Sequence, residues 1–169
     1  MWILAHTDEM QHGWHWLIEP WELHPILIHF PIAFLIGGAF VDLAGRLRRS
    51  PGLTQAATAM FVAGLVTGLL AGAAGLLAYF TVPGHTEQAH TLMYWHLAVQ
   101  VLALLLFAWP TWQRWHSWSL PPPASGLIVI WLAVIALIVG SGIGGFIIYH
   151  GGAGVEPDLL TPELREHEH

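Results

Sequence analysis

Four long apolar stretches set the limits on what this chain can fold into. They cover roughly residues 26–45, 56–80, 93–110 and 126–149, and they contain no lysine or arginine and a single acid, Asp42. Each is long enough to cross about 30 Å of hydrocarbon as a helix that rises 1.5 Å per residue. A segment in lipid must satisfy its own backbone hydrogen bonds, and none of these stretches alternates in polarity as a barrel strand does. The sequence therefore predicts an all-α integral membrane protein, built as a four-helix bundle.

The composition agrees with this class and suggests three parts. Of the 169 residues, 55% are hydrophobic and only 9% are charged, a mixture far from that of a soluble domain. We expect the four-helix domain to cover residues 24–150. Residues 1–23 mix tryptophans and histidines with acids, which is typical of an interfacial segment in the headgroup layer. Residues 151–169 form an acidic tail that contains histidines.

The arginines predict how the bundle is oriented. The chain has no lysine, and four of its five arginines fall in the loops after the first and third apolar stretches. The positive-inside rule places those loops in the cytoplasm. Both termini and the loop at 81–92 then face the periplasm, together with ten of the eleven acids. We therefore expect a multi-pass protein of the bacterial inner (cytoplasmic) membrane.

Glycines recur at four-residue spacing on two of the predicted helices. The second helix carries Gly64, Gly68 and Gly72, and the fourth carries Gly140 and Gly144. A stripe of this kind lets another helix, or a flat cofactor, approach the backbone closely. Contact with another helix is the favoured interpretation.

Histidines are distributed very unevenly. Eleven of the twelve lie on the predicted outer side, and only His116 lies on the inner side. His29 lies five residues past the start of the first helix, and His96 lies at a similar depth in the third helix, which runs in the same direction. Ionisable groups inside a membrane usually mark function, and two imidazoles at one depth on different helices suit the two axial positions of a haem. We therefore predict that His29 and His96 ligate the metal of a b-type haem near the periplasmic face.

Three further histidines form a shallower layer at the helix ends. They are His24, His90 and His150, and we expect them to line the cofactor-binding region, with His24 pairing with His150 or His90 in a second site. Helical periodicity separates His24 and His29 by about 140° around the helix axis. The two should therefore not bind the same metal unless the neighbouring prolines distort the turn.

Other chemistries find no support in the sequence. Cysteine is absent, which removes disulfides and thiolate sites, and there is no P-loop, serine-hydrolase elbow, zinc-protease helix or basic nucleic-acid face. Asp42 is the only embedded acid, and we expect it to face the inner headgroups beside the arginines. The prediction is an electron-transfer subunit, in contact with the lipid bilayer, that exchanges electrons on one side with other membrane or periplasmic redox proteins or a quinone.

Two alternatives from other functional classes remain open. The first alternative is a non-catalytic accessory or scaffold subunit of a larger respiratory or photosynthetic complex. The second is a protein that holds a periplasm-facing copper or zinc site built from the outer histidines. In each case it is more a subunit than an enzyme by itself.

Three motifs resemble those of a known family. They are His24-Pro25-Ile26-Leu27-Ile28-His29-Phe30-Pro31-Ile32-Ala33, His96-Leu97-Ala98-Val99-Gln100, and Gly144-Gly145-Phe146-Ile147-Ile148-Tyr149 before Gly154-Val155. Together they are similar to the DUF2231 family of bacterial four-helix membrane proteins, over roughly residues 22–156. The resemblance implies a layout like that of b-type cytochrome bundles, and related domains occur beside c-type cytochromes. This analogy raises the expectation of a haem.

Overall fold

The computed structural model describes residues 18–83 and 86–154, and in these residues every regular element is a helix. Residues 1–17 of the expected interfacial segment and residues 155–169 of the acidic tail lie outside the described residues, so most of each prediction does too. The elements, in chain order, are η1 (Pro20–Glu22), α2 (Leu23–Leu27), α3 (His29–Leu47), α4 (Pro51–Thr81), α5 (Glu87–Gln113) and α6 (Ala124–Gly151).

Four helical spans in the described part are long and apolar enough to cross a membrane, which confirms the predicted class. They are Pro20–Leu47, Pro51–Thr81, Glu87–Gln113 and Ala124–Gly151. Each extends beyond the apolar stretch that predicted it, because the helical backbone continues past the hydrocarbon. The Ser50 hydroxyl, for example, accepts a hydrogen bond from the Leu53 N–H and starts α4 at Pro51.

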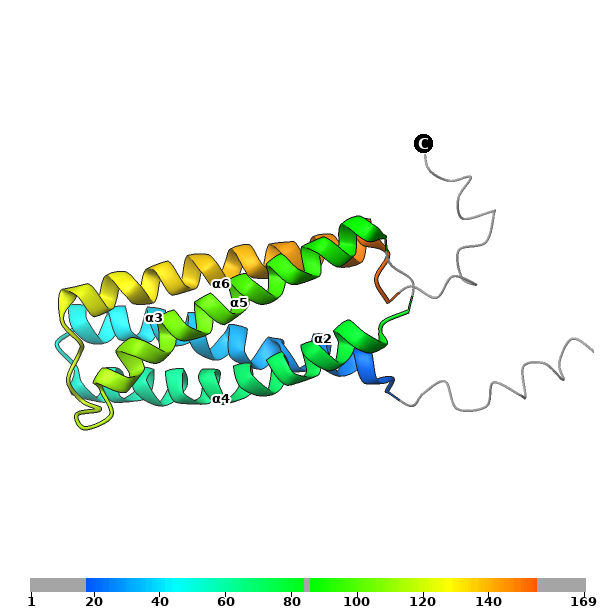
Figure 1. Cartoon of the computed structure of the whole chain (residues 1–169). Helices are drawn as coiled ribbons and strands as arrows, with labels where there is room; N and C mark the ends of the chain where they lie inside the picture. Colours follow the sequence, from blue (N-terminus) through cyan, green and yellow to red (C-terminus); the bar gives the residue numbers. More distant parts are fainter. Residues whose placement is uncertain (1–17, 84–85, 155–169) are drawn as a thin grey trace, which may run out of the picture.

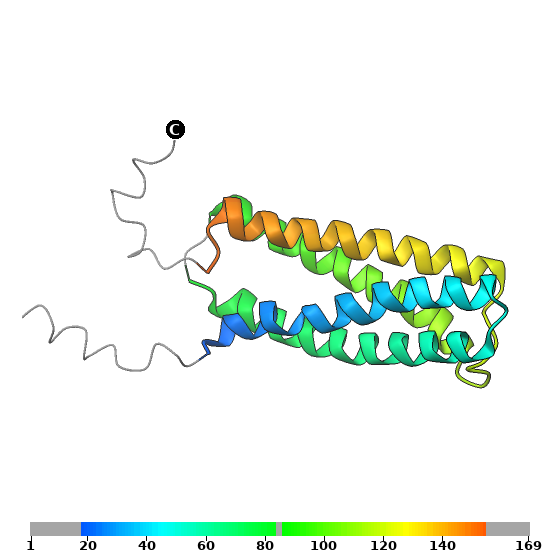
Figure 2. The ribbon, with the colours of Figure 1, turned by 180° about the vertical axis from the view of Figure 1, so that it is seen from behind.

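The spans are arranged as two helical hairpins. α3 packs along α4, and α5 packs along α6 (Figure 1). Contacts of α4 with α5 and of α3 with α6 join the hairpins into a bundle, so α3 and α5 lie across its diagonal. Both views show the two hairpins close together at the end that carries the 48–50 turn and further apart at the end where η1 begins and α6 ends (Figure 2).

The first span begins earlier than predicted. The Glu19 N–H donates to Glu22 Oε2 at 3.0 Å, and Pro20 occupies the first helical position, so a helical turn forms before His24. Ile28 then separates α2 from α3. The expected start of the first helix at His24 is therefore wrong by four residues, and His24 lies inside the span.

The apolar core is concentrated at the end of the bundle opposite the chain termini. Its fully buried members include Leu35, Phe61 and Phe107, and the Phe61 and Phe107 rings lie 5.7 Å apart. A Cβ added to Gly64 would lie 2.6 Å from the Leu35 side chain, and one added to Gly68 would lie 2.7 Å from Leu104. These two glycines serve helix contact, as the favoured interpretation of the stripe predicts, but a Cβ at Gly72 would meet no atom within 4 Å, so the interpretation is wrong for the third glycine.

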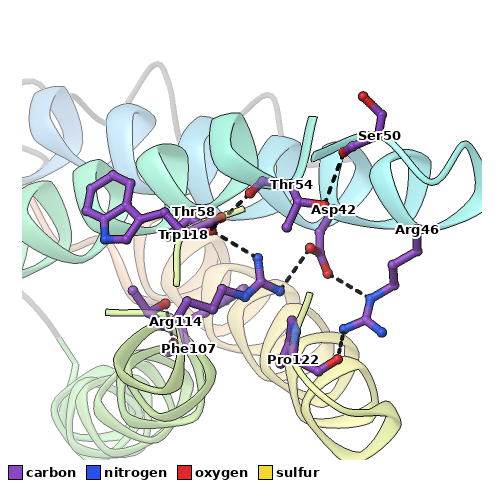
Figure 3. Close-up of polar contacts among 10 residues, drawn as sticks. Asp42, Arg46, Ser50, Thr54, Thr58, Phe107, Arg114, Trp118 and Pro122 are labelled. Atoms are coloured by element: carbon purple, nitrogen blue, oxygen red, sulfur yellow. Dashed lines mark hydrogen bonds and ion pairs between the residues drawn. The ribbon is translucent and has the colours of Figure 1, made fainter. Parts of the chain in front are cut away.

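A buried ionic cluster lies at the same end (Figure 3). Asp42 is fully buried, with Oδ1 2.9 Å from Arg114 Nη2 and Oδ2 3.3 Å from Arg46 Nε. Arg46 Nη2 donates to the Pro122 carbonyl at 2.6 Å, and Arg114 Nη1 donates to the Thr58 hydroxyl at 3.3 Å. Burial lowers the pKa of Arg114, and the hydrogen bond and charge of Asp42 oppose this shift.

The environment of Asp42 corrects one prediction. Asp42 does lie beside arginines, but it does not face the headgroups, because Arg114 reaches it from the far end of α5 and closes it off from the surface. The cluster ties α3 and α4 to the loop between α5 and α6.

Candidate functional site

The rings of His24 and His96 meet between the two hairpins, toward the end of the bundle that carries the termini. Their centroids are 6.0 Å apart and their planes are perpendicular. His24 comes from α2 and His96 from α5, and both side chains are half-buried. Two imidazoles from distant parts of the chain thus form one pair inside the membrane-spanning bundle.

His24 is held in place by α4, the second helix of the hairpin to which His24 belongs. His24 Nδ1 donates a hydrogen bond to the carbonyl of Ala71 on α4 at 2.8 Å. Four residues later on α4, a Cβ at Gly75 would lie 2.8 Å from the same nitrogen. The ring therefore fits only because Gly75 has no side chain.

His96 is held in the same way by α6. Its Nδ1 donates to the Gly140 carbonyl at 2.8 Å, and a Cβ at Gly144 would lie 2.9 Å from its Cε1. The Gln100 amide packs on Gly140, where an added Cβ would lie 2.9 Å from Gln100 Cδ. The glycine spacing on α6 that the sequence showed serves these two polar side chains.

The two hairpins thus repeat one arrangement. In each, a histidine on the first helix donates through Nδ1 to a carbonyl on the second helix, and a glycine four residues after that carbonyl makes room for the ring. Because a carbonyl can only accept, Nδ1 carries the proton and a neutral ring keeps its lone pair on Nε2. In the described part of the chain neither Nε2 has a hydrogen bond.

The structure does not bring His29 to this pair. Its side chain is exposed on the outside of the bundle, and Nδ1 lies 3.4 Å from the Ile26 carbonyl. The contact between the rings shows that His24 lies at the level of His96, and helical periodicity turns His29 to the opposite side.

The other two predicted residues lie apart from the pair. His90 Nε2 is 2.9 Å from the Tyr79 hydroxyl, and His150 stacks on Phe146 with ring centroids 4.2 Å apart. Both histidines are exposed. Of the five predicted site residues, the structure brings together only His24 and His96. The expected second pairing of His24 with His90 or His150 does not occur.

The remaining members of the site were not identified from the sequence. They are the backbone of Ala71, the ring-accommodating Gly75, and the Gly140 carbonyl. The four-residue spacing of Gly140 and Gly144 pointed to Gly140, and no sequence signal pointed to Ala71 or Gly75. A backbone carbonyl acceptor leaves no trace in residue type.

The bundle matches a family pattern over residues 20–157, and the family is described as a predicted membrane protein, DUF2231. The chain belongs to the DUF2231 family. No curated protein and no solved structure matches it.

The DUF2231 match begins where η1 begins and extends past the end of α6. It therefore covers both hairpins, the histidine pair and the ionic cluster. Together with the four spans, it identifies the chain as a multi-pass membrane protein whose helices contact the lipid bilayer. The family description names no activity.

Proposed function

We propose that this protein is a membrane electron-transfer subunit that holds a b-type haem between His24 and His96. The observation that carries the proposal is the histidine pair itself, in which both Nδ1 atoms are hydrogen-bonded to carbonyls and both Nε2 atoms are left over. Histidines that ligate metals usually donate their other ring N–H in this way, which fixes the tautomer and the ring orientation.

The spacing of the rings fits one metal between them. A metal about 2.0–2.1 Å from the Nε2 atom of each of two facing imidazoles places their ring centroids about 6.4 Å apart. The observed separation is 6.0 Å. With the two Nε2 atoms turned toward each other, a small opening of the pair would accommodate a shared metal.

The number of ligands favours a haem over a bare ion. In the described part of the chain no group of three or more His, Asp or Glu side chains is placed to hold a metal ion. A structural zinc site needs four protein ligands, and a catalytic one needs three. A haem brings its own equatorial nitrogens, so two histidines complete its coordination.

The surroundings of the pair also suit a flat cofactor. The helix positions against the two rings are the small residues Ala71, Gly75, Gly140 and Gly144, so the ring faces meet no bulky side chain from α4 or α6 at these positions. When bound, the haem supplies one-electron transfer. The chain itself orients the two imidazoles through the Ala71 and Gly140 carbonyls.

The proposed electron transfer is one-sided. Leu35, Phe61 and Phe107 fill the core between the histidine pair and the Asp42 cluster. At the cluster end the described residues offer only His116, which is exposed. With the exposed arginines Arg48 and Arg49 in the cytoplasm, the pair faces the periplasmic side of a bacterial inner membrane, where it would exchange electrons with a redox partner.

Purification from haem-replete cells tests the proposal directly. We expect a Soret band, iron in the sample and a pyridine haemochrome spectrum of b-type haem. His24→Ala and His96→Ala should each abolish the low-spin spectrum, whereas His29→Ala, the matched control, should retain it. If the wild-type protein lacks both iron and a Soret band and does not bind added haem, the proposal is wrong and an accessory subunit becomes the better description.

A further inference from the structure

His29 faces the lipid from within the first membrane span, and the histidine pair makes no use of it. It lies on one helical face with Ile26, Phe30 and Ala33, and all four side chains are exposed. Its only hydrogen bond in the described part of the chain joins Nδ1 to the Ile26 carbonyl at 3.4 Å, which is long for such a bond. Its Nε2 has no partner there.

An imidazole in this position needs a partner from the membrane. A polar group that faces hydrocarbon without a hydrogen bond is costly, and ionisable residues inside membrane spans usually mark function. The partner must be soluble in lipid and must carry a hydrogen-bond donor or acceptor at the depth of His29. A lipid tail has neither.

We propose that His29 is the binding site for the headgroup of a lipid-soluble hydroquinone. The Nε2 atom accepts a hydrogen bond from a hydroxyl group of the ring. The aromatic ring of Phe30 and the side chain of Ile26 flank His29 and offer apolar contacts to a flat ring, and the small side chain of Ala33 leaves space one turn deeper.

The geometry links this site to the histidine pair. His29 follows His24 by five residues, which is about 7.5 Å along the helix axis and about 140° around it. One short helical segment thus presents an inward imidazole to the bundle and an outward imidazole to the lipid. As electron donor, the hydroquinone would become a quinone by giving two electrons, one at a time, to the haem and releasing two protons to the aqueous side, with the haem reoxidised by its redox partner after each transfer. This role rests on the proposed haem at His24 and His96, whereas binding at His29 does not require the haem.

Photolabelling of the full chain in lipid nanodiscs tests the binding site. An azido-quinone, reduced to its hydroquinone in the sample, should label the segment around residues 26–33, and excess unlabelled hydroquinone should compete. His29→Leu should reduce the labelling at least tenfold, and His29→Gln, which keeps a hydrogen-bond acceptor, should restore most of it. His90→Leu, which removes another exposed histidine, is the matched control and should label like the wild type.

The outcomes separate this inference from the proposed function. Labelling that persists in His24→Ala, where haem is lost, supports a hydroquinone site that stands independently of the cofactor. Labelling that does not respond to His29→Leu overturns the site, even if the protein binds haem. A third outcome combines two results: the wild type shows no competable labelling, and His29→Leu changes the oligomeric state in nanodiscs. This outcome would show that a second copy of the chain covers the face around His29, and it would also overturn the hydroquinone site.

Discussion

The Asp42 carboxylate lies 2.9 Å from the Arg114 guanidinium, and neither side chain is more than 1% exposed. Arg46 provides a second cation for the same carboxylate and reaches the Pro122 carbonyl, so the cluster connects the two hairpins at the end opposite the histidine pair. Removal of one member of a buried ion pair leaves the other charge without compensation.

Asp42→Leu should therefore lower the free energy of unfolding by about 3–5 kcal/mol, because Arg114 would remain buried without its counter-charge. Denaturant unfolding in mild detergent measures this effect. The double variant Asp42→Leu/Arg114→Met replaces the pair by apolar side chains and should recover much of the loss. A single variant as stable as the wild type would contradict the role of the cluster.

Gly144→Ala and Gly75→Ala should each weaken haem binding. The added methyl group would lie 2.9 Å from His96 Cε1 or 2.8 Å from His24 Nδ1, and the ring would have to leave its carbonyl acceptor. Overpacking of this kind costs about 1–3 kcal/mol, which corresponds to roughly 5- to 150-fold in affinity. Haem titration followed by the Soret band measures the change.

Gly142→Ala is the control for these two variants, since a Cβ there meets no atom within 4 Å. It should bind haem like the wild type. Equal losses in all three variants would mean that the effect comes from the helix backbone and not from the rings.

Phe61→Ala should lower the free energy of unfolding without changing the histidine pair. Phe61 is fully buried in the apolar core against Phe107, and truncation of such a ring costs about 3–5 kcal/mol. Because the core lies away from the histidine pair, the absorption spectrum of bound haem should not change. A shifted spectrum in a variant that is still folded would show that the core sets the geometry of the pair.

The predicted orientation is open to labelling, because the chain has no cysteine of its own. In intact spheroplasts, a membrane-impermeant maleimide should label Thr86→Cys, in the loop before α5, and should not label Ser119→Cys, in the loop before α6. Both variants should label after lysis. The reverse pattern in intact spheroplasts would place the histidine pair on the cytoplasmic side.

The sequence was sufficient to predict the class of the fold, since the length and apolar character of the four spans depend on composition alone. It also showed the glycine spacing of α6, whereas the predicted ligand role of His96 stays a prediction. It did not identify which histidine of the first span turns inward. That choice depends on the rotation of the helix about its axis, which is set by packing of α2 against α4 and not by residue type.

Contacts between distant segments could not be predicted from the sequence either. The ion pair of Asp42 with Arg46 follows from their spacing of one helical turn, but the pair with Arg114 depends on how α5 packs against α3. The carbonyl acceptors of His24 and His96 come from Ala71 and Gly140, whose residue types carry no sign of this role.

The division of the histidine pair between the hairpins has a consequence for biogenesis. His24 and its acceptor Ala71 both belong to the first hairpin, so that hairpin alone contains only half of the site, and the other half comes from α5 and α6. A ligand that requires both imidazoles can then be acquired only by a chain whose insertion is complete. Loading of the proposed haem would thus distinguish finished molecules in the membrane from those that lack the second hairpin.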